Sequence, residues 1–98
     1  MLYNTPERVV FSNIGAITTA AFALRGGYYW IESKSTGTGT IDLKKLGPDG
    51  VTYTARITQI TATAGQQSIY LPPGTYEWVV ATFTANYLEI SRIPTAVE

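Results

Sequence analysis

Carboxylates are the side chains most able to do acid–base chemistry in this chain, because it contains neither histidine nor cysteine. The lack of histidine excludes a Ser-His-Asp triad and the usual general base near neutral pH. The lack of both residue types excludes the ordinary zinc sites and any disulfide. The seven carboxylates are Glu7, Glu32, Asp42, Asp49, Glu77, Glu89 and Glu98.

The spacing of these carboxylates does not indicate a catalytic pair. A glycoside hydrolase needs two carboxylates about 5–10 Å apart that flank a cleft. Strand alternation instead directs four of them to solvent, namely Glu32, Asp42, Glu77 and Glu89. Asp49 stands alone in the turn "GPDG", whereas calcium favours a cluster of oxygen ligands. We therefore expect no catalytic residue, no metal site and no cofactor, and we expect that the protein is not an enzyme.

The composition of the chain argues against nucleic acid and membrane partners. The 98 residues suit one domain, and the formal net charge is zero. A neutral chain has no excess of cations to neutralise phosphates, so nucleic acid is not an expected partner. No membrane partner is expected either, because the longest apolar runs, "AAFAL" and "YYWI", are too short to span a bilayer, and no secretory signal is visible at the start.

The surface is expected to be poor in charge. Charged residues make up only 14% of the chain, against about 25% in typical soluble domains. Either a partner covers part of the surface, or threonine replaces charge as the solvated residue of a β surface. The sequence leaves these two interpretations open.

The elements that must position these side chains are strands. Fifteen threonines and seven tyrosines favour β structure, and no segment shows a capped helical period. Turn signals every 8–12 residues predict an antiparallel β-sandwich or jelly-roll-like domain of about seven to eight short strands. We expect an N-terminal arm over residues 1–8 and a single sandwich domain over residues 9–98. The expected strands are 9–14, 17–24, 28–33, 40–46, 51–57, 68–71, 76–84 and 87–93.

Two Pro-Gly motifs predict specific turns. "GPDG" fits a type I turn over residues 47–50, in which Gly50 takes a positive φ and closes a bulged hairpin. "LPPGTY" fits a type II turn with Pro73 and Gly74 at its centre. A phosphate-binding glycine loop would need a following helix, and a strand is expected after each motif. These residues therefore have a structural interpretation.

Large aromatic side chains are expected on an outer face. Alternation groups Tyr28 and Trp30 with the charged Glu32, which leaves Tyr29 and Ile31 for the core.

The segment 76–84 is apolar on both faces. If Glu77 faces solvent, Val79 and Phe83 face outward with it. A strand that is apolar on both sides is typical of cover by another element or subunit. Three interpretations stay open: an inter-subunit surface, rings buried by thick sheets or a wrong face assignment, and a sugar-stacking platform.

The expected arm also offers contacts. Leu2 and Tyr3 are apolar anchors, and Arg8 is a charged hydrogen-bond donor. The candidate interface residues are therefore Leu2, Tyr3, Arg8, Tyr28, Trp30, Val79 and Phe83.

Four motifs carry a family resemblance. They are "GGYY" at 26–29, "LKKLGPDGVTY" at 43–53, "LPPGTY" at 71–76 and "TANYLEISRIP" at 84–94. Together with the intervening chain from Leu24 to Pro94, this pattern resembles small virion proteins of tailed bacteriophages, of the capsid decoration (cement) or head accessory type. The motifs are turn-and-strand signatures, and residues 1–16 lie outside the match.

The resemblance implies a structural role without an active site. Such proteins bind the outer capsid surface between major capsid protein subunits, often as trimers, after synthesis in the host cytoplasm. The resemblance thus implies the major capsid protein as partner and a homo-oligomer, with a trimer favoured. The alternative function is a head-fibre or tail-associated module that contacts host-surface glycans through Tyr28 and Trp30.

Overall fold

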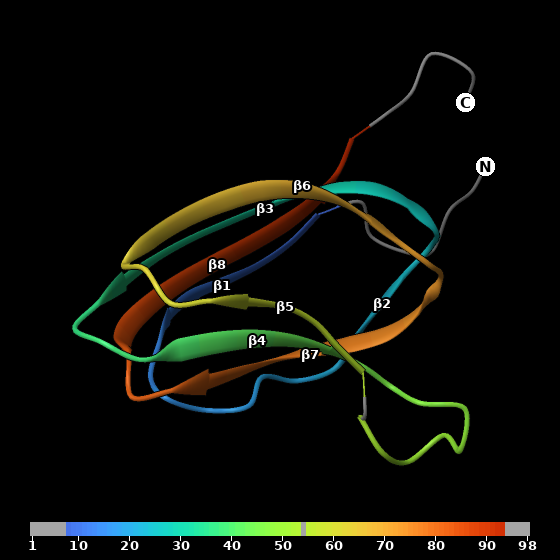
Figure 1. The fold of residues 1–98 in the computed structure, drawn as a ribbon, viewed down its shortest axis with the longest axis horizontal. Helices are drawn as coiled ribbons and strands as arrows, with labels where there is room; N and C mark the ends of the chain where they lie inside the picture. The colour runs from blue at the N-terminus through green and yellow to red at the C-terminus, as the bar shows by residue number, and fades with distance from the viewer. Residues whose placement is uncertain (1–7, 54, 94–98) are drawn as a thin grey trace.

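The computed structural model describes residues 8–53 and 55–93, which form eight strands and no helix (Figure 1). The strands are β1 (Arg8–Ile14), β2 (Phe22–Leu24), β3 (Gly27–Thr36), β4 (Thr40–Lys45), β5 (Ala55–Ile60), β6 (Ala64–Leu71), β7 (Gly74–Ala81) and β8 (Thr84–Arg92).

The strands form two four-stranded antiparallel sheets that face each other. Sheet A has the order β1-β8-β3-β6 and sheet B the order β2-β7-β4-β5. Figure 1 shows the two sheets as separate layers, and only the β4–β5 connection stays within one sheet. This strand order is that of a jelly roll, an eight-stranded double-sheet fold. The predicted β-sandwich or jelly-roll-like fold is confirmed.

The core lies between the sheets, and alternation along the central strands directs side chains into it. In β3, Tyr29 and Ile31 are fully buried, whereas Tyr28 and Glu32 are exposed. In β7, Tyr76 and Trp78 fill the opposite side of the core. Burial of aromatic side chains removes about 150–250 Å² of surface each from water. The predicted inward faces of β3 and β7 are confirmed.

A buried asparagine ties two loops together at one end of the sandwich. The Asn86 Nδ2 donates hydrogen bonds to the carbonyl oxygens of Ile14, at 2.9 Å, and Phe83, at 3.2 Å. A third carbonyl, that of Gly15, lies at 3.3 Å. Because buried backbone carbonyls need donors, this one side chain holds the start of the β1–β2 connection against the β7–β8 turn.

The expected strand over residues 17–24 is interrupted. Only Phe22–Leu24 belongs to a strand, and Thr18 forms an isolated bridge to Val79. Around this bridge the Thr19 amide donates to the Trp78 carbonyl at 2.9 Å, and the Thr19 hydroxyl accepts from the Trp78 amide at 3.1 Å. The chain then leaves the ladder at Ala20 and Ala21 and rejoins it at Phe22.

Other boundaries also differ from the sequence prediction. β5 covers 55–60 instead of 51–57, so Val51 lies in a loop and is 78% exposed. β6 starts four residues earlier than expected, at Ala64. The bounds of both strands follow the hydrogen-bonded ladders that they form, β5 with β4 and β6 with β3.

The "GPDG" segment forms the predicted turn. The Gly50 amide donates to the Gly47 carbonyl at 3.1 Å, and Gly50 has a φ of 75°. The Asp49 Oδ1 accepts from the amides of Val51 and Thr52, both at 2.9 Å. These bonds satisfy backbone donors of the loop that joins β4 to β5.

The type II turn predicted at Pro73-Gly74 is wrong. That turn needs a positive φ at Gly74, and Gly74 is absent from the glycines with positive φ. The reason is topological: the segment leads from β6 in sheet A to β7 in sheet B instead of closing a hairpin.

Candidate interaction surface

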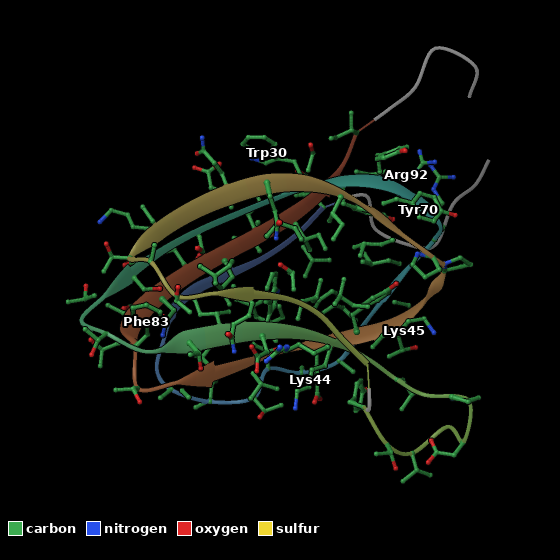
Figure 2. All side chains as sticks on the ribbon, viewed as in Figure 1. Trp30, Lys44, Lys45, Tyr70, Phe83 and Arg92 are labelled. Atoms are coloured by element: carbon green, nitrogen blue, oxygen red, sulfur yellow. The ribbon has the colours of Figure 1, made fainter. Side chains whose placement is uncertain are left out.

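The outer face of sheet A carries three neighbouring aromatic side chains, Tyr28 and Trp30 of β3 and Tyr70 of β6, which we call the aromatic patch. Tyr28 and Tyr70 are opposite each other in the ladder, and their ring centroids lie 5.6 Å apart. The two rings are 54% and 55% exposed. In Figure 2 Trp30 points away from the sandwich on the outer side of sheet A.

Trp30 is held along its strand. Its Nε1 donates a hydrogen bond to the Glu32 Oε1 at 3.1 Å, and its ring is half-buried. The residues across from it are Ser68 on β6 and Ser91 on β8. These small neighbours cannot cover an indole, so one side of the ring stays available to a partner.

The other part of this face carries positive and negative side chains in equal number. Arg8 and Glu89 form an ion pair at 2.7 Å, and Glu89 lies opposite Glu32 in the ladder. Lys34 lies opposite Tyr87. A shallow depression of about 150 Å³ lies here, lined by the outward side chains of Val10, Ser12, Glu32, Lys34, Tyr87 and Glu89 and by the inward-facing Ser33 and Leu88. The face therefore has an aromatic end and a polar end with two cations and two anions.

The predicted outward position of Phe83 is wrong. Phe83 is completely buried, and Figure 2 shows it at the end of the sandwich where β7 turns into β8. β7 ends at Ala81, and the Phe83 amide donates back to the Ala81 carbonyl at 2.9 Å around Thr82, whose φ is 75°. This γ-turn breaks the alternation, so Phe83 does not continue the face of Glu77. A buried Phe83 cannot be an interface residue of the folded chain.

Val79 lies where alternation predicts, on the outer side of sheet B with Glu77, but it is half-buried. The bridge to Thr18 lies beside it. The surrounding sheet B face is polar, because Asp42 accepts from Gln59 at 2.8 Å and Lys44 is opposite Glu77. Val79 thus lies among polar side chains and small alanines of the described part of this face and is not part of an aromatic patch.

The expected arm is described only at its last residue. Arg8 is the first residue of β1 and pairs with Ser91, so its assignment to an arm is wrong. Its guanidinium already binds Glu89 of the same chain. Leu2 and Tyr3 lie outside the described residues.

Metal-ligating side chains do not gather in the described part of the chain. Over residues 8–53 and 55–93, no three carboxylates come together in a metal-binding group. The same residues contain no helix long and apolar enough to cross a bilayer.

Burial raises the pKa of the Tyr76 phenol to about 12, and this hydroxyl donates to the Pro72 carbonyl at 2.5 Å. Tyr76 therefore acts as a neutral hydrogen-bond donor in the core at physiological pH.

Sequence reasoning missed Tyr70. Its local signal was weak, because the expected strand began only at Ser68, but alternation with the buried Leu71 does direct Tyr70 outward. What the local sequence could not give is that β6 lies beside β3, which joins Tyr70 to Tyr28.

Comparison with protein-family models and with curated proteins finds no match for this chain.

Proposed function

We propose that the protein is a structural virion protein of a tailed bacteriophage that binds the outer capsid surface between major capsid protein subunits and stabilises the shell. The observation that carries the proposal is the aromatic patch on an otherwise neutral jelly roll. Jelly rolls recur among viral capsid proteins, although they also occur in lectins, so the fold alone supports both classes.

The chemistry of the patch favours a protein partner. Tyrosine and tryptophan are enriched among the residues that dominate protein interfaces. Tyr28, Trp30 and Tyr70 form one cluster, with small serines beside Trp30. Removal of apolar surface from water contributes about 25 cal/mol per Å², so a few hundred Å² supply several kcal/mol before association costs. Repetition of one such site in an oligomer would strengthen attachment to a shell through multivalency.

The geometry of the Tyr28–Tyr70 pair disfavours a glycan platform that includes both of these rings. A flat sugar-stacking platform needs rings that lie in one plane. The planes of Tyr28 and Tyr70 are instead inclined by 71°. Only one of the two rings can therefore lie parallel to a sugar chain that runs across the sheet.

The test is co-sedimentation with capsids of the phage whose genome encodes the chain. The double variant Tyr28→Ser/Tyr70→Ser removes two exposed rings, and Tyr87→Ser removes a ring from the polar end of the same face as a matched control. We expect at least about tenfold weaker capsid binding for the double variant, equal to about 1.4 kcal/mol, and little change for the control. Equal binding by all three proteins, or no binding by the wild type, contradicts the proposal.

The glycan alternative has its own readout. Slow migration of the wild type in polysaccharide affinity gels, lost in the double variant, would favour the binding module. The proposed virion protein migrates equally with and without polysaccharide.

A further inference from the structure

β6 presents a long, regular and open strand edge. It pairs with β3 over its whole length, from Leu71 opposite Gly27 to Ala64 opposite Lys34, without a register shift. No strand of the described residues lies on its other side. Figure 1 shows β6 along one margin of the molecule. The outer edge of such a strand presents a row of backbone N–H and C=O groups that can pair with another strand.

The other three sheet edges carry features that discourage such pairing. β2 is only three residues long. β1 includes a register shift between Phe11 and Ile14 and starts with the charged Arg8. β5 pairs with β4 across a shift between Leu43 and Lys44 and carries Arg56. Short strands, bulges and charges are the usual protection of sheet edges.

β6 has none of these features. Its sequence, AGQQSIYL, contains no charged residue and no proline. Its outward side chains include Gln66, Ser68 and Tyr70, which two copies can bring together without like-charge repulsion.

We propose that β6 pairs antiparallel with β6 of a second copy of this chain, which joins the two copies of sheet A into one eight-stranded sheet. A second copy is the occupant that fits, because an uncharged strand is self-complementary and offers nothing specific to a charged partner. The pairing also closes at two copies, since among the described residues β6 is the one edge of sheet A that lacks such protection. Pairing of β6 with β1 of another copy would instead grow a filament, and the bulge in β1 opposes it.

This dimer has a consequence for the surface of sheet A. A two-fold axis perpendicular to the joined sheet keeps both outer faces on the same side. Tyr70 lies on the outward face of β6, so the two aromatic patches flank the new interface. The assembly is a dimer and not the trimer that the family resemblance implies. The inference depends on the strand edge alone and goes beyond the proposed capsid role.

The test is sedimentation equilibrium of the purified full chain over a concentration series, without capsids. Ser68→Lys places a charge near the middle of β6, where the two copies would bring like charges together. Ser12→Lys is the matched control, because Ser12 is an exposed serine on β1 at the opposite edge of sheet A. Gln66→Lys, on the same face as Ser68, replaces the first variant if that one does not fold by circular dichroism.

We expect the wild type and Ser12→Lys to form dimers that dissociate on dilution, and the β6 variant to dissociate at least tenfold more readily. A wild type that stays monomeric or forms trimers overturns the inference. So does a folded β6 variant that dimerises as well as the control. Since no capsid is present, failure here leaves the capsid proposal standing, and failure of capsid binding leaves the dimer standing.

Discussion

Tyr28 and Tyr70 lie directly opposite each other on β3 and β6 and meet edge to face, with ring centroids 5.6 Å apart and planes inclined by 71°. Such a pair contributes about 0.5–1.5 kcal/mol beyond its buried area. Each ring nevertheless keeps more than half of its surface in water. The pair thus orders two large side chains on the surface of sheet A without using them to fill the core.

Phe83, unlike Tyr28 and Tyr70, is expected to stabilise the core. It is completely buried at the β7–β8 turn, so Phe83→Ala leaves a cavity and should lower the free energy of unfolding by about 3–5 kcal/mol. Chemical denaturation followed by tryptophan fluorescence measures this loss. Phe11→Ala, at a half-buried ring of β1, is the matched control and should lose less. A larger loss at Phe11 than at Phe83 would contradict the position of Phe83 in the core.

Gly50→Val is expected to destabilise the fold through the backbone. Gly50 has a φ of 75°, and a Cβ there would meet no atom within 4 Å, so the cost comes from strain and not from a clash. A β-branched residue in this conformation costs about 1–3 kcal/mol.

Gly15→Val is the control for this substitution. A Cβ at Gly15 also meets nothing within 4 Å, and Gly15 does not have a positive φ. Thermal unfolding should therefore show a clear drop for the Gly50 variant and a change within about 0.5 kcal/mol for the Gly15 variant. Equal melting temperatures for the two variants would mean that the turn does not require a glycine.

Asp49 is expected to make the stability of the β4–β5 loop depend on pH. The backbone amides of Thr52 and Val51 donate to its carboxylate and hold its pKa below the usual 3.8. A carboxyl whose pKa is lower in the folded state stabilises that state when the pH is above the unfolded pKa, and this contribution is lost as the pH falls through the folded pKa.

The measurement is the difference in melting temperature between the wild type and Asp49→Asn across the acid range. The other carboxylates are common to both proteins, so they largely cancel. The advantage of the wild type should be greatest above about pH 5 and should shrink as the pH falls below about 4. A difference that does not change with pH would show that the carboxylate charge does not stabilise this turn.

The local pattern predicted those parts of the fold in which alternation is regular. Glu32 and Lys34 mark the outer face of β3, so the positions of Tyr28, Tyr29 and Ile31 followed directly. The buried position of Phe83 could not be predicted in this way. Thr82 takes a positive φ, which is uncommon for a non-glycine residue and has no signal in the hydrophobic pattern. The first four residues of β6 were missed because alanine, glycine and glutamine do not favour strands by themselves, and the ladder with β3 holds them.

In the candidate surface, too, local alternation predicts some positions and not others. Trp30 and Tyr28 could be predicted to face outward because they share one strand with charged residues. Tyr70 joins them only through the pairing of β6 with β3, which brings together Tyr28 and Tyr70 although they lie 42 positions apart in the sequence. Such non-local pairing depends on the packing of the whole sandwich, which the local sequence does not encode.

Electron cryo-microscopy of the phage particle tests the proposed function most directly. A reconstruction of particles with the protein should be compared with one of particles from a phage in which its gene is deleted. We expect the difference density on the outer capsid surface to fit the jelly roll, with the aromatic patch of Tyr28, Trp30 and Tyr70 against the major capsid protein. Difference density confined to the tail or the fibres, no difference density at all, or a jelly roll whose aromatic patch points to solvent would contradict it.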